Sequence, residues 1–154
     1  MGPSETWLKV ATNSIILVVE DDQTGRYALK QLLERFDYDA LLVSSGEEAL
    51  AAIAVANYVC ILMDIKLTGI DGFECTRRIR QLESKTGRRT PIVALTGLVG
   101  DGARRAAKEA GMDDYLSKPF EVESLRKTLL RYVYEPSKPN LKVITNIKRN
   151  QSVS

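Results

Sequence analysis

Four short apolar segments of the sequence each end in a side chain that can take part in chemistry. These side chains are Glu20, Asp21 and Asp22 after IILVV, Asp64 after VCILM, Thr96 at the end of PIVALT, and Lys118 after DYLS. Carboxylates, a hydroxyl and an amine gathered in one place can bind a hard cation and stabilise a phosphoryl group. They are far apart in sequence, so only a fold that brings the segment ends together makes a site of them.

The carboxylates indicate a metal site with oxygen ligands. Crowded carboxylates raise one another's pKa values unless a cation lies among them. The sequence has no histidine, and its two cysteines, Cys60 and Cys75, are too far apart for a CxxC motif and fit buried structural thiols. Without histidine there is no Ser-His-Asp triad and no histidine ligand. The remaining donors favour Mg²⁺, with Mn²⁺ as a substitute.

Asp64 is the candidate nucleophile for phosphoryl transfer. Lys118 precedes Pro119, and an X-Pro bond is where a cis peptide costs least, so a cis turn here can aim the lysine into the site. Thr96 precedes Gly97, which leaves room beside the hydroxyl. In this interpretation Mg²⁺ and Lys118 neutralise the phosphoryl oxygens while Asp64 attacks in line.

Each of these residues also has an ordinary structural explanation. Asp21 or Asp22 can cap the helix that follows, and Asp64 can form a turn. Thr96 can simply end a strand, and Lys118 can be a solvated charge. The functional interpretation depends on all four segment ends lying at one edge of the fold.

The elements that must position these residues follow from periodicity. The strand candidates are 15–19, 39–44, 59–63, 91–96 and 114–117. Between them, apolar residues recur at helical spacing, as in the stripe of Ala103, Ala106, Ala107 and Ala110. Strands apolar on both faces that alternate with helices predict an α/β fold. We expect a doubly wound, flavodoxin-like, five-stranded parallel sheet in the order 2-1-3-4-5, with five helices and a crevice between the first and third strands.

The chain of 154 residues suits one globular domain, which we expect over 15–134. Residues 1–14 are expected to be an arm or linker, and the proline- and asparagine-containing segment 135–154 a linker or tail. A net charge of only +2 does not favour direct binding to nucleic acid. The apolar runs are too short to span a bilayer, so we expect a cytoplasmic protein with no direct membrane partner.

Four segments of the sequence resemble the receiver domain of bacterial-type two-component response regulators. They are ILVVEDD, ILMDIKLTGIDGFE, PIVALTG and AGMDDYLSKPF, which occur in this order and extend the resemblance over about 15–134. The resemblance is greatest to receivers attached to hybrid sensor histidine kinases. It implies a signalling domain of a phosphorelay, which promotes its own phosphorylation and dephosphorylation but is not a turnover enzyme.

The resemblance also implies a role for each matching residue. Asp64 is the phosphoacceptor, and the metal ligands are Glu20 (through water), Asp21, Asp64 and the backbone carbonyl of Lys66. The residues implied to hold the phosphoryl group are Thr96 and Lys118, and those implied to switch conformation are Thr96 and Tyr115. Taken without the resemblance, Tyr115 is simply a half-buried aromatic residue of a strand.

One departure from the family pattern lies in the loop after Asp64. Receivers commonly carry Met-Pro there, and this chain has Leu67-Thr68. Loss of the proline frees the backbone φ angle, and Thr68 adds a hydroxyl. The geometry of the loop and the rate of phosphorylation are therefore left open.

A chain without histidine must receive its phosphoryl group from another molecule. The implied donors are a histidine kinase, a histidine phosphotransfer domain or a small acyl phosphate. A stand-alone receiver, a receiver that is part of a hybrid kinase, and a homodimer are all compatible with the sequence.

Two other functions are weighed against this one. A phosphatase of the haloacid-dehalogenase kind needs a second aspartate two residues after its nucleophile, where this chain has Lys66. A pseudo-receiver that acts as an interaction module without phosphorylation usually lacks one of the key residues, and this chain has all of them.

Overall fold

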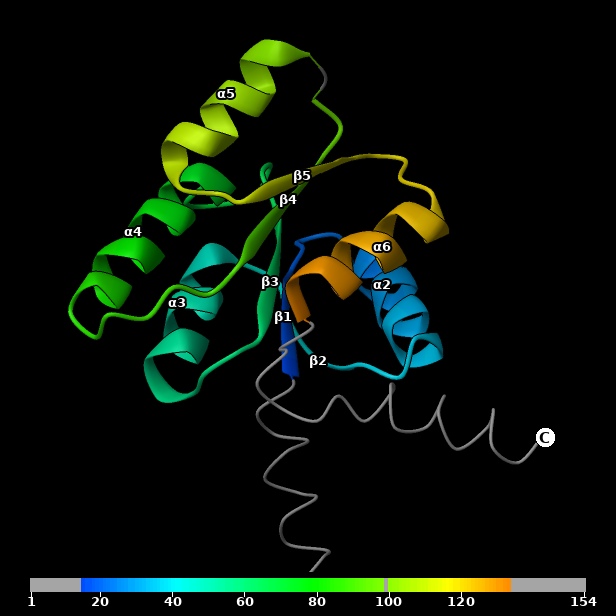
Figure 1. Ribbon diagram of the computed structural model, residues 1–154, viewed down its shortest axis with the longest axis horizontal. Helices are drawn as coiled ribbons and strands as arrows, with labels where there is room; N and C mark the ends of the chain where they lie inside the picture. The colour runs from blue at the N-terminus through cyan, green and yellow to red at the C-terminus, as the bar shows by residue number, and fades with distance from the viewer. Residues whose placement is uncertain (1–14, 99, 134–154) are drawn as a thin grey trace, which may run out of the picture.

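The computed structural model describes residues 15–98 and 100–133, in which five strands alternate with five helices (Figure 1). The strands are β1 (Ile15–Val19), β2 (Asp39–Val43), β3 (Cys60–Asp64), β4 (Ile92–Thr96) and β5 (Asp114–Ser117). The helices are α2 (Gln23–Arg35), α3 (Gly46–Val55), α4 (Gly72–Ser84), α5 (Asp101–Ala110) and α6 (Val122–Val133). The expected arm 1–14 and tail 135–154 lie outside the described residues.

All strand pairs are parallel, and the strand order is β2-β1-β3-β4-β5. The predicted fold and strand order are therefore confirmed. The strand ends differ from the expected ones by single residues: β3 includes Asp64, β2 stops before Ser44, and β4 begins after Pro91. Directly after β2, the N–H of Ser44 donates to the Glu48 carboxylate of α3.

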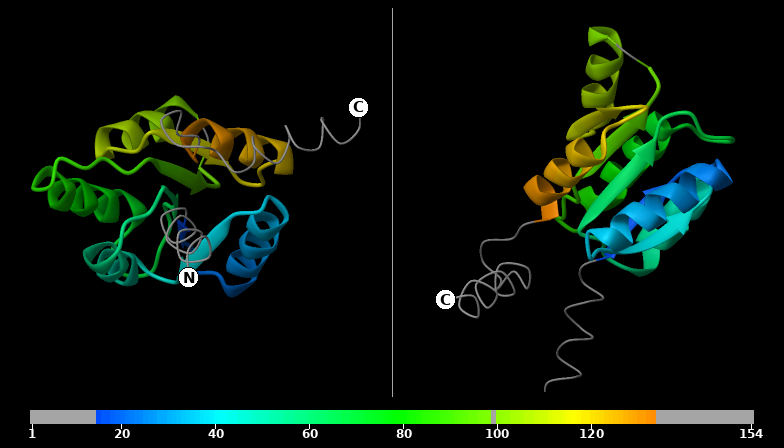
Figure 2. Two further views of the ribbon diagram at one scale, coloured as in Figure 1. Left: turned by 60° about the horizontal axis from the view of Figure 1, so that its bottom comes forward. Right: turned by 90° about the vertical axis from the view of Figure 1, so that its right-hand side faces the viewer.

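Helices cover both faces of the sheet. Figures 1 and 2 show α3, α4 and α5 on one face and α2 and α6 on the other. Successive strand residues point to opposite faces, so Leu17 packs on the α3–α5 side and Val18 on the α2–α6 side. Both faces of the central strands are therefore apolar, as the continuous runs in the sequence predict.

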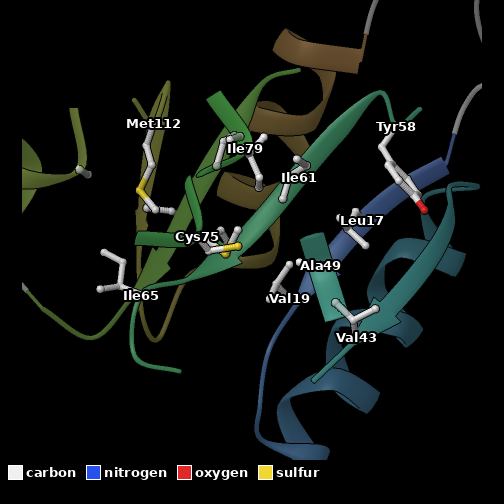
Figure 3. Packing of buried hydrophobic residues seen from close by; sticks show 14 residues of the cluster. Leu17, Val19, Val43, Ala49, Tyr58, Ile61, Ile65, Cys75, Ile79 and Met112 are labelled. Atoms are coloured by element: carbon white, nitrogen blue, oxygen red, sulfur yellow. The ribbon is translucent and has the colours of Figure 1, made fainter. Parts of the chain in front are cut away.

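The larger cluster of buried apolar side chains lies between the sheet and α3, α4 and α5. Figure 3 shows Leu17 of β1 and Ile61 of β3, which are paired in register, with Cys75 and Ile79 of α4 packed into the same cluster. Cys60 and Cys75 are both free and buried. Burial raises the pKa of each thiol to about 12, so both behave as small apolar side chains. The prediction of structural cysteines is confirmed.

Three helices begin with a side-chain cap immediately beyond the carboxyl edge of the sheet. Asp22 caps α2 by accepting from the N–H of Gly25, and Ser45 and Asp71 cap α3 and α4 in the same way. The ordinary explanation for Asp22 is therefore correct: it is a helix cap. These caps fix where the chain turns from each strand into the following helix.

The opposite edge of the sheet is held by a network of charged side chains around Arg80. The guanidinium of Arg80 donates to the carbonyls of Gly111 at 2.9 Å and Thr90 at 2.7 Å. It also pairs with Glu83 at 2.7 Å and Asp113 at 2.8 Å, and its side chain is only 14% exposed. Asp113 in turn accepts from the N–H of Ile92. One side chain of α4 thus fixes the segments that lead into β4 and β5.

We expect Arg80→Met to lower the free energy of unfolding by about 3–5 kcal/mol, because the buried Glu83 carboxylate loses its guanidinium partner and Asp113 loses one of its two. Urea denaturation measures the effect. Arg77→Met is the matched control, since the side chain of Arg77 is 53% exposed and pairs with Glu74 on its own helix. The control should change stability by less than about 0.5 kcal/mol. Equal effects of the two changes would contradict a structural role of the network.

Candidate functional site

The structure brings three carboxylates together at the carboxyl edge of the sheet. Glu20 and Asp21 follow β1, and Asp64 ends the neighbouring strand β3. One carboxylate oxygen from each residue lies within 4.8 Å of the others. Glu20 and Asp64 are buried, with exposed fractions of 4% and 6%. The parallel register explains the meeting, because Val19 lies opposite Met63 and the next residues of both strands reach the same edge.

Arg26 of α2 fixes the backbone that carries two of these acids. Its Nη1 donates to the carbonyl of Glu20 at 2.8 Å and to the carbonyl of Asp21 at 2.9 Å. The N–H of Glu20 also donates to the carbonyl of Val43 on β2. The turn between β1 and α2 is therefore held from two sides.

Lys118 reaches the same cluster from the end of β5. Its Nζ donates to Glu20 Oε1 at 2.7 Å and to Asp64 Oδ2 at 3.1 Å. Its backbone N–H donates to the carbonyl of Thr96, and the peptide bond to Pro119 is cis. The ammonium of Lys118 therefore lies among the carboxylates, where its charge offsets part of theirs.

Burial and charge set the protonation of the buried pair. Burial raises the pKa of Glu20 to about 7, and Asp64 adds to the increase while Lys118 opposes it. Burial alone lowers the pKa of Lys118, but its hydrogen bonds to Glu20 and Asp64 and their charges outweigh that effect and raise it. The lysine is therefore fully charged at neutral pH, whereas Glu20 is close to the midpoint of its titration.

The donor set fits a divalent cation. Glu20 Oε2 is buried and has no hydrogen-bond partner among the described residues. A buried carboxylate oxygen without a partner is costly, and a cation beside it removes that cost. The other donors are carboxylate oxygens, which Mg²⁺ prefers. Lys66 lies beside the cluster, since its N–H donates to Asp64 Oδ1 at 3.2 Å. A role for its carbonyl as a ligand stays a prediction.

The loop after Asp64 is held by contacts that periodicity does not reveal. The N–H of Gly72 donates to the carbonyl of Ile65 at 2.8 Å, and the N–H of Ile70 donates to Glu47 Oε1 at 3.1 Å. A Cβ atom on Gly72 would lie 2.3 Å from the carbonyl oxygen of Asp64, so only glycine fits there. The dipeptide Asp71-Gly72 is the sequence signal for this turn.

Thr96 and Tyr115 meet at Leu98. Thr96 is 1% exposed, and its Oγ1 accepts from the N–H of Leu98 at 3.0 Å. The hydroxyl of Tyr115 donates to the carbonyl of the same residue. The guanidinium of Arg104 lies 5.6 Å from the centre of the Tyr115 ring. The two residues implied to switch conformation are therefore linked through one residue of the β4–α5 loop.

The sequence matches the family described as the response regulator receiver domain over residues 16–130. It is 38% identical over 118 residues to the hybrid signal transduction protein dokA of Dictyostelium discoideum, a match that covers 77% of this chain and 7% of dokA. It is 40% identical over 125 residues to the transcriptional regulatory protein ResD of Bacillus subtilis, covering 79% of this chain and 50% of ResD. The chain thus spans half or less of the length of these relatives.

Solved structures agree with the sequence match. One is the receiver domain of sensor histidine kinase PA1611 from Pseudomonas aeruginosa, which was solved with magnesium in its active site cleft. It is 38% identical in sequence to this chain and superposes with a TM-score of 0.72. The match covers 79% of this chain and 98% of the PA1611 receiver chain. Another is the co-crystal structure of the Saccharomyces cerevisiae histidine phosphotransfer protein Ypd1 with the receiver domain of Ssk1. The match has a TM-score of 0.73 at 28% sequence identity, and it covers 79% of this chain and 89% of the matched chain.

Residues 15–98 and 100–133 contain no helix that is long and apolar enough to cross a bilayer. Sequence match, strand order and the grouping of acids at one sheet edge agree with one another. This chain belongs to the response regulator receiver domain family.

Proposed function

We propose that this receiver accepts a phosphoryl group on Asp64 from a phosphohistidine donor, in a Mg²⁺-dependent step of a two-component phosphorelay. The observation that carries the proposal is the cluster of Glu20, Asp21 and Asp64, with Lys118 bonded to two of the three acids. Such a site combines a nucleophile, metal ligands and a cation that can move to the phosphoryl group.

Asp64 is positioned for in-line attack by its place at the end of a buried strand. The N–H of Lys66 and the ammonium of Lys118 each donate to a different oxygen of its carboxylate, which limits rotation of the group. In the reaction an Asp64 oxygen forms the new P–O bond while the P–N bond of the donor phosphohistidine breaks. The displaced imidazole remains on the donor protein.

Glu20, Asp21, Asp64 and the carbonyl of Lys66 are the proposed ligands of Mg²⁺, for which Mn²⁺ can substitute. When bound, the cation supplies charge neutralisation for the phosphoryl oxygens. The buried Glu20 Oε2 without a partner supports this assignment, as does the magnesium in the related PA1611 receiver.

Phosphorylation would change the surface through Thr96 and Tyr115. The phosphoryl group offers new acceptors to the Lys118 ammonium and the Thr96 hydroxyl, and bonds to a charged acceptor are strong. Because Thr96 and Tyr115 both bond to Leu98, a movement of Thr96 alters the contact of the tyrosine. We propose that the switch is a population shift between two packings of this region.

The partner is proposed to be a histidine kinase or a histidine phosphotransfer protein, because the chain has no histidine of its own. The complex of Ypd1 with the Ssk1 receiver supports a partner of this kind. Two free cysteines support a reducing location such as the cytoplasm. We also propose that the receiver domain spans residues 15–134. It can belong to a longer hybrid kinase, and it can form a homodimer.

With Mg²⁺ and acetyl phosphate, the wild-type protein should gain the mass of one phosphoryl group. Asp64→Asn should gain none, because an amide cannot act as the nucleophile. Intact-mass spectrometry measures the adduct, with circular dichroism to show that the variant is folded. Asp71→Asn is the matched control, because this aspartate caps α4 outside the cluster. An equal adduct in Asp64→Asn would reject the site, and no adduct in the wild type would favour a pseudo-receiver.

The raised pKa of Glu20 predicts how the stability of the metal-free protein varies with pH. Between pH 4.5 and about 7 the unfolded chain has released a proton that folded Glu20 still holds. The stability contributed by this proton is therefore complete below pH 4.5 and lost as pH rises through about 7. We therefore compare the free energies of unfolding of the wild type and Glu20→Gln. The value for the wild type minus that for Glu20→Gln should be smaller at pH 8 than at pH 5.

Urea denaturation in EDTA at the two pH values tests this expectation. Glu74→Gln is the control, because salt bridges to Arg78 and Arg77 lower the pKa of Glu74 below its usual range. Glu74 is then charged in both the folded and the unfolded chain at pH 5 and at pH 8, so its contribution should change little between the two. A difference between wild type and Glu20→Gln that does not change with pH would show that Glu20 titrates normally.

A further inference from the structure

Thr68 makes a paired contact with one of the proposed metal ligands. Its backbone N–H and its Oγ1 both donate to Asp21 Oδ2, each at 3.2 Å. The two residues are 47 positions apart and belong to different loops at the carboxyl edge of the sheet. The contact therefore joins the loop after β3, which also carries Lys66, to the acidic turn after β1.

The two hydrogen bonds leave half of the Asp21 carboxylate available. An ionised carboxylate has about four lone-pair sites on its two oxygens. Two donors on Oδ2 hold that oxygen toward Thr68 and leave Oδ1 for a cation. Asp21 is only partly buried, so without these donors its side chain would sample other rotamers. Fixing it in advance lowers the entropy lost when a cation binds.

Thr68 can do this because its loop is anchored on both sides. On one side the N–H of Lys66 donates to Asp64 Oδ1. On the other side the N–H of Ile70 donates to Glu47 Oε1 at 3.1 Å. The residue between these anchors is therefore held in place, and its two donors reach one carboxylate oxygen. Thr68 is also the residue that departs from the proline common in receivers, and a proline has no N–H to donate.

We propose that Thr68 is a positioning residue for the metal centre: it holds the Asp21 carboxylate in the orientation that binds Mg²⁺ and thereby raises the affinity for the ion. This inference rests on the proposed Mg²⁺ site. It assigns the metal affinity of this chain partly to a side chain that does not itself contact the ion.

The test is the Mg²⁺ dissociation constant of wild type, Thr68→Ser and Thr68→Val, measured by isothermal titration calorimetry at one pH and ionic strength. Valine keeps the branched shape and the N–H but loses the hydroxyl, whereas serine keeps the hydroxyl. We expect Thr68→Val to bind roughly three- to tenfold more weakly, the effect of losing one ordinary hydrogen bond, because this bond is exposed to solvent. Thr68→Ser should stay within about twofold of the wild type.

Two controls separate positioning from general damage. Thr86→Val removes a hydroxyl that donates to the carbonyl of Glu83 beyond the end of α4, and it should leave Mg²⁺ binding unchanged. In an Asp21→Asn background, Thr68→Val should have little further effect, because the carboxylate that it positions is gone.

Equal or tighter Mg²⁺ binding by Thr68→Val would overturn the inference while leaving the proposed function intact. A full-size effect that persists in the Asp21→Asn background would overturn it as well. Failure of the wild type to bind Mg²⁺ at millimolar concentration would instead overturn the proposed metal site and this inference together.

Discussion

The site depends on the interaction of the Lys118 ammonium with two buried carboxylates. Lys118 donates to Glu20 and Asp64 at 2.7 and 3.1 Å, and both acids are almost fully buried. Two such carboxylates cannot both be charged at close range without a cation nearby. The lysine supplies part of that charge, but one Glu20 oxygen has no hydrogen-bond partner within residues 15–98 and 100–133. A cation beside this oxygen would offset the remaining charge, and in the proposed function the lysine exchanges carboxylate oxygens for phosphoryl oxygens.

The sheet makes this arrangement possible by delivering residues from three strands to one edge. The acids that follow β1 and end β3 have fixed relative positions because both faces of these central strands are packed. The edge strand β5, which leads to Lys118, is held by its pairing with β4. At the other edge, the Arg80 network ties α4 to the segments that lead into β4 and β5. Thr96 ends β4 at the carboxyl edge of the sheet, and Tyr115 of β5 is linked to it through Leu98.

Much of this could be predicted from the sequence, because strand-end positions follow from topology alone. Once a parallel sheet in the order 2-1-3-4-5 is expected, Asp64 must lie beside the acids after β1, whatever the loops do. The contacts of Arg26, Thr68 and Arg104 were not predicted. They join side chains from separate elements, so they depend on loop conformation and rotamers, for which periodicity gives no signal.

The most direct test of the proposed phosphoacceptor site is a crystal structure of this protein with Mg²⁺ and beryllofluoride, a mimic of the phosphoryl group. We expect beryllium bonded to a carboxylate oxygen of Asp64, the cation bound by Asp21 and Asp64, and Lys118 and Thr96 donating to fluorine. Beryllofluoride attached elsewhere, or a cation held by other residues, would contradict the claim that these strand ends form one phosphoacceptor site.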